Sequence, residues 1–468
     1  MSKLKDQGEE KKPRSINPYA LLFAVIVLCG LLSFVVTPGS YVRNEIDGRT
    51  VIDPDSYHIT EKSPVGFLDF FRAVPEGLIG SGNVVFLILI VGGTVQILNE
   101  SGALGVGISS VVKKTANRGN LIIWIFMIIF SILGGFMGWV EAAIPFVPIF
   151  IPIIISLGYD AMTAGAVVII GLLVSFATGP TNMYTVGIAH EIAELPLYSG
   201  FGFRTIVMFL FVITGMLYTV RYANKVKKNP ELSLTKDVDV SDMKINIDEF
   251  DDKKPTSGQI ASLVILFIAF VIVIYGMLQM GWGMNDMTAV FLLVGIIVGA
   301  LNKMGITGTV NSFMDGIKAS VGGAMIVGIA RGVQWILEQG GAIDPIIHTL
   351  SNAIDGWPAF GSALGMVAIV ALLNGLVPSG SGKAMALMPL IIPLADLVGI
   401  TRQTTVLAYQ LGDGITNMFW FTYGTLLMFL SQARIPLKAW YKFVVPLMVI
   451  LFIIGAAALF VAIQIGYN

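Results

Sequence analysis

A polar, glycine-rich run passes directly into a proline-spaced apolar run at Pro378-Ser-Gly-Ser-Gly-Lys383-Ala-Met-Ala-Leu-Met-Pro389-Leu-Ile-Ile-Pro393. An earlier stretch has the same order of features, Gly138-Trp-Val-Glu141-Ala-Ala-Ile-Pro145-Phe-Val-Pro148-Ile-Phe-Ile-Pro152. Prolines this dense rarely belong to one continuous spanning helix. Each stretch therefore predicts a re-entrant hairpin whose two short arms meet at a polar tip, near residues 138–142 in one and 379–383 in the other.

The composition is that of a chain buried in lipid. Of 468 residues, 55% are hydrophobic and 13% charged, with a mean hydropathy of +0.81, whereas about a quarter of a soluble chain is charged. Seven uncharged runs approach or reach the roughly 17–25 residues that cross a bilayer. These runs are Tyr19–Val36, Val84–Leu98, Leu121–Val140, Thr205–Val220, Ile260–Met280, Met287–Leu301 and Phe443–Ile463. The sequence predicts an all-α, multi-pass protein of the cell (inner or plasma) membrane, with the lipid bilayer as a partner.

Several function classes are excluded or disfavoured. A net charge of −1 gives no support to nucleic-acid binding, and the single Cys29 leaves no disulfide framework. His190 and Glu194 have the spacing of a metal pair but lack a third ligand, so no metal is predicted. Neither a nucleotide-binding loop nor a catalytic nucleophile motif is present. We therefore expect no enzyme and no cofactor, and energy must come from an ion or exchange gradient.

Residues 1–17, which are rich in lysine, predict a cytoplasmic tail. A first membrane repeat is expected over 18–221, a hydrophilic linker over 222–258 and a second repeat over 259–466. Within the repeats we place the hairpins at about 138–158 and 378–398, and broken helices at about 160–195 and 401–430.

Three blocks recur in the same order. Val95, Gln96 and Glu100 return as Val333, Gln334 and Glu338, displaced by 238 residues. Pro148 and Pro152 return as Pro389 and Pro393, displaced by 241, and Gly179, Thr181 and Asn182 return as Gly414, Thr416 and Asn417, displaced by 235. Chance similarity of apolar helices would preserve Leu, Ile and Val instead. The pattern indicates two sequence-related halves, as in transporters with inverted repeats.

The third block marks a break inside a helix in each half, Ala177-Thr-Gly-Pro-Thr-Asn182 and Gly412-Asp-Gly-Ile-Thr-Asn417. Gly and Pro free backbone carbonyls and amides, while Thr and Asn add side-chain oxygens that suit Na⁺. The half-helix N-termini can also face an anionic group. One such motif alone is usually a kink, but its recurrence favours a substrate or ion site. A tip facing a break, twice over, predicts two clamps around one site.

Four charged residues fall within apolar surroundings: Glu141, Lys383, Asp413 and Arg331. Ionisable groups at membrane depth cost about 2.5–3.5 kcal/mol and are usually functional. Two interpretations stay open. The charges neutralise one another or reach the headgroups, or they meet a charged substrate, with Lys383 replacing a coupling cation.

Asn374-Gly-Leu-Val-Pro-Ser-Gly-Ser-Gly-Lys-Ala384, the proline-spaced run after it and the break at 412–417 resemble the YfcC family. That family is grouped with the DcuC-type anaerobic C4-dicarboxylate carriers of the ion transporter superfamily, and the resemblance covers residues 17–466. It implies a homodimeric inner-membrane carrier with scaffold and transport domains and elevator-like movement. It also implies either dicarboxylates or basic amino acids such as arginine and ornithine as substrates.

The resemblance and the breaks together give one set of substrate- or ion-binding residues. The set is Gly138, Glu141, Ala142, Thr178, Gly179, Thr181, Asn182, Asn374, Ser379, Gly380, Ser381, Gly382, Lys383, Asp413, Gly414, Thr416 and Asn417. Sodium-coupled relatives carry Ser-Asn-Thr at their tips, whereas these tips carry Glu141 and Lys383, so coupling to Na⁺ or H⁺ stays open.

Glu141 and Asp413 facing Lys383 would suit an ammonium-bearing amino acid better than a dianion. We therefore predict a secondary transporter of a small charged metabolite, a basic amino acid moved by exchange or ion coupling. A C4-dicarboxylate carrier is the alternative. A channel, which needs a continuous polar lining, and a non-transporting scaffold, which needs no paired breaks, are the alternatives of another class.

The topology leaves one conflict. Hairpins that enter from opposite faces need an odd number of crossings between them, but the sequence suggests six: Asp160–Leu195, Thr205–Val220, Ile260–Met280, Met287–Leu301, Val321–Leu337 and Phe360–Leu376.

Outside the spans, Tyr41–Ser63 suggests an extramembrane hairpin. Val65–Leu78, with a counterpart near Val310–Ile317, suggests an in-plane amphipathic helix.

Overall fold

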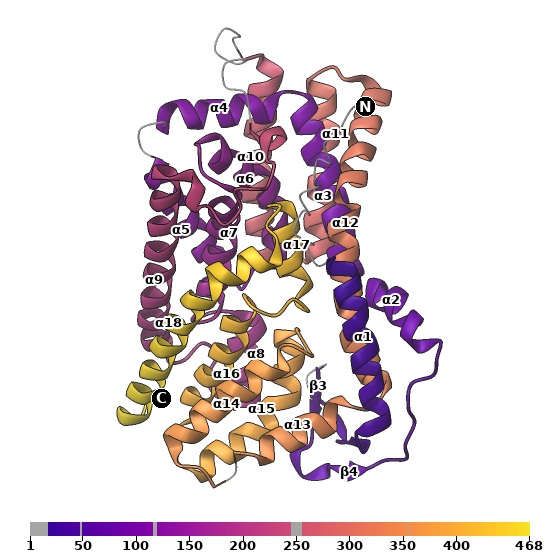
Figure 1. Cartoon of the computed structure of the whole chain (residues 1–468), viewed down its shortest axis with the longest axis vertical. Coiled ribbons are helices and arrows are strands. Elements are labelled where there is room, and N and C mark those ends of the chain that lie inside the picture. Colours follow the sequence, from indigo (N-terminus) through magenta and orange to yellow (C-terminus); the bar gives the residue numbers. More distant parts are fainter. Residues whose placement is uncertain (1–16, 47–48, 116–118, 245–254, 355) are drawn as a thin grey trace, which may run out of the picture.

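The computed structural model describes residues 17–46, 49–115, 119–244, 255–354 and 356–468. Residues 1–16 of the predicted cytoplasmic tail lie outside this part, as do residues 245–254 of the linker. The described residues are almost entirely helical (Figure 1). The first half contains α1 (Pro18–Val35), α2 (Asp69–Gly80), α3 (Gly82–Glu100), α4 (Ala103–Thr115), α5 (Gly119–Met137), α6 (Val147–Ser156), α7 (Ala161–Phe176), α8 (Ile188–Ile192) and α9 (Phe201–Lys228). The second half contains α10 (Ser257–Gln279), α11 (Met284–Leu301), α12 (Gly305–Gln339), α13 (Ile343–Asn352), α14 (Ala359–Leu373), α15 (Gly380–Leu397), α16 (Arg402–Thr416), α17 (Gly424–Gln432) and α18 (Leu437–Gln464).

Eight of the described helices are long and apolar enough to cross a membrane: α1, α3, α5, α9, α10, α11, α12 and α18. Seven of them coincide with the uncharged runs of the sequence, and the eighth, α12, contains the span expected at Val321–Leu337. The prediction of a multi-pass membrane protein is confirmed.

The helices form two groups (Figure 1). On one side α12 packs against α1, α2 and α3, and α11 packs against α3. On the other side α7 packs between α5 and α9, while α16 packs between α14 and α18. Helix α17 reaches from the second group to α12. The tips and breaks all belong to the second group.

The two ends of the molecule carry different extramembrane segments. At one end the linker packs on the start of α7, where the Asp160 carboxylate accepts hydrogen bonds from Ser233 (2.6 Å) and Tyr222 (2.8 Å). At the other end β2 (Arg43–Ile46) pairs antiparallel with β3 (Arg49–Ile52), as the predicted extramembrane hairpin requires. There β1 (Gly39–Ser40) also pairs with β4 (His58–Ile59).

Two expectations from the sequence are corrected. Residues 138–158 contain a 3₁₀ turn, Glu141–Phe146, followed by α6, and residues 378–398 contain the single helix α15. Neither stretch by itself contains the two helical arms that the sequence suggested. Pro389 and Pro393 lie inside a continuous α15, because neighbouring helices in a membrane bundle can satisfy the backbone groups that proline frees.

The second correction concerns the proposed in-plane counterpart. Val310–Ile317 is part of α12, which is continuous over 35 residues. The crossing expected at Phe360–Leu376 corresponds to α14, a helix of 15 residues that ends at Leu373, before the second tip.

Candidate functional site

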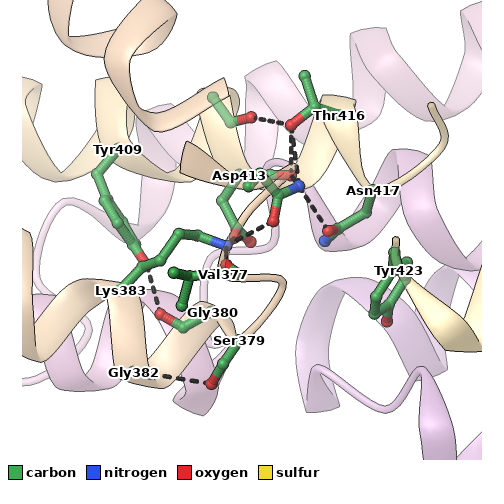
Figure 2. A network of polar contacts seen from close by, with 12 residues as sticks. Val377, Ser379, Gly380, Gly382, Lys383, Tyr409, Asp413, Thr416, Asn417 and Tyr423 are labelled. Carbon is green, nitrogen blue, oxygen red and sulfur yellow. Dashed lines mark hydrogen bonds and ion pairs between the residues drawn. The ribbon is translucent and has the colours of Figure 1, made fainter. Parts of the chain in front are cut away.

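Lys383 lies in the first turn of α15 and points toward Asp413 on α16 (Figure 2). The Lys383 Nζ lies 2.7 Å from Asp413 Oδ1, and the two side chains are 2% and 1% exposed. The same ammonium donates to Asn374 Oδ1 at 2.5 Å and to the Val377 carbonyl at 2.8 Å. Three oxygens thus surround it. Because a positive charge is unfavourable at a helix N-terminus, the acid and these acceptors are what hold it there.

Asn374 connects the second tip to the second break. Its Nδ2 donates to the Asp413 carbonyl (3.0 Å), to Thr416 Oγ1 (2.9 Å) and to Asn417 Oδ1 (2.8 Å). Helix α16 ends at Thr416, so these acceptors belong to its last turn and to the residue that follows it. The structure therefore brings the predicted residues Asn374, Lys383, Asp413, Thr416 and Asn417 into one buried network.

The rest of the second tip is fixed by backbone contacts. The Ser379 hydroxyl accepts from the Gly382 N–H at 3.1 Å and caps the N-terminus of α15. The Tyr409 hydroxyl donates to the Gly380 carbonyl. Ser381 is half-buried in the same first turn. Two buried oxygens, Asp413 Oδ2 and Thr185 Oγ1, have no hydrogen-bond partner among the described residues. Asp413 Oδ2 and the methyl group of Thr185 lie beside Gly380.

At the first tip Glu141 does not meet Lys383. Its Oε1 accepts hydrogen bonds from the hydroxyls of Tyr423 (3.0 Å) and Thr425 (3.2 Å). These residues begin α17, directly after the second break, and Tyr423 lies beyond Asn417 in Figure 2. The N-terminus of α17 is a favourable position for a carboxylate. Sequence reasoning missed both hydroxyls, although they stand within a polar interruption, Thr422-Tyr-Gly-Thr425.

The first break is held mainly by backbone acceptors. Asn182 caps the helical segment that begins at Met183 and donates to the Phe176 carbonyl at 3.3 Å. Thr181 Oγ1 donates to the Phe136 carbonyl at 2.6 Å, which joins the break to the end of α5. Gly138 has φ 69°, and a Cβ there would lie 2.5 Å from Asn182 Oδ1. The tip and the break are therefore in contact at this end too.

The remaining predicted residues of this clamp are buried packing positions. Ala142 is 4% exposed, and the Thr178 hydroxyl donates back to the Val174 carbonyl at 3.4 Å. Gly414 lies where the two broken helices cross, since a Cβ there would overlap Ala177.

Gln410, which the sequence did not single out, links the two broken helices. Its Nε2 donates to the carbonyls of Gly179 (2.8 Å) and Phe176 (3.3 Å). Its Oε1 accepts from the fully buried Arg204 at 2.9 Å. No ion pair of Arg204 occurs within the described residues. A cationic side chain therefore lies behind the first break.

Two predicted charges have local partners. Arg331, on α12, donates to Gln334, and within the described residues no ion pair joins it to either tip. Glu194, considered with His190 as a metal pair, instead pairs with Arg402 at 2.9 Å. His190 is fully buried. Among the described residues no group of three His, Cys, Asp or Glu side chains could hold a metal ion.

The profile of the DcuC family, C4-dicarboxylate anaerobic carrier, matches residues 17–464. The chain belongs to the DcuC family. A protein of Escherichia coli, named "Putative basic amino acid antiporter YfcC", is 30% identical over the full length of both chains. An uncharacterised protein of Haemophilus influenzae is 29% identical over 97% of this chain and 99% of its own. The family confirms a transporter and the resemblance seen in the sequence.

Two solved structures align with this DcuC-family chain over most of its length. The Alcanivorax borkumensis YdaH transporter covers 97% of the chain and 99% of its own length at 16% identity, with a TM-score of 0.41. Neisseria gonorrhoeae MtrF covers 96% and 95% at 16% identity, with a TM-score of 0.44.

Proposed function

We propose that the protein exchanges basic amino acids of the arginine and ornithine type across the cell membrane, and that Glu141 binds their cationic group. The observation that carries this proposal is the difference between two acids, the buried Asp413 and the half-buried Glu141. Asp413 is neutralised by Lys383, whereas Glu141 has only neutral hydroxyl donors, and no ion pair of Glu141 occurs within the described residues. A carboxylate without a counterion attracts a cationic ligand.

A second feature supports a substrate with several donors. Asp413 Oδ2 and Thr185 Oγ1 are buried oxygens without a partner among the described residues, and such groups are costly unless a ligand or water satisfies them. An ammonium group supplies the missing donors. A C4-dicarboxylate, the substrate in the name of the family, would need a free cation. The ammonium of Lys383 already has three oxygen partners, and the buried guanidinium of Arg204 donates to Gln410 and Gln403.

Reconstituted exchange tests the proposal. Proteoliposomes loaded with ornithine should take up external arginine, and vesicles loaded with succinate, a C4-dicarboxylate, should not. Uptake of succinate into succinate-loaded vesicles, with no uptake of arginine, would favour the dicarboxylate alternative. Ion currents far above carrier turnover would indicate a channel instead.

The proposed architecture consists of two inverted repeats, each with a re-entrant hairpin and a broken helix. Counting α14 as an arm of the second hairpin leaves five crossings between the tips: α7 with α8, α9, α10, α11 and α12. Five is odd, so the conflict in the sequence-based count disappears. Basic residues at the linker end, Lys225, Lys227, Lys228, Lys303 and Arg434, favour a cytoplasmic linker. The strands then lie outside the cell.

We further propose that α1, α2, α3, α11 and α12 form a fixed scaffold and that the group carrying the tips moves as the transport domain of a homodimer. The two helix groups and the family resemblance support this division. Native mass spectrometry in mild detergent should therefore report a dimer. An active, reconstituted species that is monomeric by the same measurement would contradict it.

Sodium coupling is not part of the proposed mechanism. The Lys383 ammonium already binds Asp413 Oδ1 and two oxygens of the second tip, and Gln410 binds two carbonyls of the first break. The two buried oxygens left without a partner, Asp413 Oδ2 and Thr185 Oγ1, are assigned to the substrate. The charge of Arg204 behind Gln410 further disfavours a cation. Arginine exchange should therefore stay within about twofold when choline replaces Na⁺ at constant ionic strength. A tenfold stimulation by Na⁺ would overturn this expectation.

A further inference from the structure

A cavity of about 510 Å³ lies at the end of the molecule that carries the strands, which is the proposed extracellular end, between the strands, the end of α12, α13 and α15. Figure 1 shows these elements gathered around β3. The polar lining includes Arg43, Gln334, Glu338, Asp344 and Lys383. The volume is within the range of about 300–1,000 Å³ that holds small ligands in proteins.

The cavity ends on the second tip. Gly382 and Lys383 form part of its wall, and the opposite wall comes from α12, which belongs to the other helix group. A molecule inside it would therefore lie between the proposed scaffold and the proposed transport domain, next to the tip that must open. A substrate that enters from outside would pass through this cavity on its way to the buried site.

One acidic residue of the cavity lining has no oppositely charged partner among the described residues. Arg43 binds Asp344 with two hydrogen bonds of 2.9 Å, and Lys383 is paired with Asp413. Glu338 accepts a hydrogen bond from the neutral amide of Gln334 at 2.7 Å, and no ion pair of Glu338 occurs within the described residues. The nearby Arg331 donates to Gln334 and is not a lining residue.

We infer that this cavity is an external antechamber that binds the cationic amino acid before it reaches the buried site, with Glu338 as the counterion of its guanidinium or ammonium group. The inference rests on the proposed function and adds a second, outer site to it. Glu338 is exposed in this open, partly apolar cavity, and an unneutralised acid there raises the local concentration of a cation. Asp344 is already bound to Arg43, so Glu338 is the lining acid that can bind the cationic group of the substrate.

The test compares Glu338→Gln with Glu100→Gln in reconstituted arginine exchange. Glu100 is the matched control, because it stands at the equivalent repeat position on α3 and accepts from Gln96 at 3.0 Å in the same way, but does not line the cavity. Glu338→Gln should raise the KM for external arginine about fivefold with little change in kcat, since one screened charge at an open site is removed. Glu100→Gln should leave this KM unchanged.

The salt dependence provides a second readout. The wild-type KM for external arginine should rise with ionic strength, and that rise should be weaker in Glu338→Gln. Equal KM values and salt slopes in wild type and Glu338→Gln would overturn the antechamber while arginine exchange continues. A wild type that does not exchange arginine would overturn the proposed function and this inference together.

Discussion

Replacing Lys383 by alanine should abolish transport while leaving a folded protein. The ammonium is the counterion of Asp413, and both side chains are almost fully buried. Removing one partner of a buried ion pair costs about 3–5 kcal/mol. The lost ion pair joins the second tip to the second break, where the substrate site is proposed, so its loss should disrupt that site. Exchange should drop more than about 100-fold, the ratio to which about 3 kcal/mol corresponds.

The controls for Lys383 separate a lost site from a lost fold. Lys318→Ala removes a lysine from an exposed pair with Asp315 and should change nothing measurable. A double variant, Lys383→Met with Asp413→Asn, removes both charges and should regain most of the thermal stability without regaining transport. Transport at the wild-type rate by a monodisperse Lys383→Ala protein would contradict the proposed role.

Replacing Glu141 by glutamine should cost most of the affinity for arginine. The variant keeps the size of the side chain and an acceptor for Tyr423 and Thr425, but it removes the charge that a cationic substrate would meet. Glu141 is half-buried in the free protein, and a bound substrate would cover the rest of it, so the loss of one partner of this charge pair should cost about 2–5 kcal/mol in binding. The Kd for arginine should therefore rise at least about 30-fold, and Glu194→Gln, at an exposed pair with Arg402, should not raise it.

The chemistry-bearing residues were predictable where they interrupt a regular pattern. Gly, Pro, Thr and Asn inside an apolar run identified both breaks, and the helices end at Phe176 and Thr416. The ion pair of Lys383 with Asp413 follows from the cost of leaving either charge alone in the membrane. The other two oxygens that bind the Lys383 ammonium belong to Asn374 and Val377, which precede the second tip, and not to the carbonyls of the break.

The parts that the sequence could not predict depend on which helices meet. Tyr423 and Thr425 bind Glu141 across a separation of more than 280 residues, and no periodicity links the two segments. Gln410 and Arg204 are single polar residues in long helices and look like surface positions until packing buries them. The apolar residues of α14 fit a crossing as well as the hairpin arm proposed above, so the sequence alone does not choose between them.

The central claim is that Glu141 binds a basic amino acid. The most direct test is to measure the binding of arginine and of succinate to purified wild type, Glu141→Gln and Lys383→Ala. The account predicts that arginine binds wild type more tightly than succinate does, and that Glu141→Gln weakens arginine with little effect on succinate. The contrary result is an arginine affinity unchanged in Glu141→Gln together with a selective loss of succinate binding in Lys383→Ala. In that case the protein carries dicarboxylates.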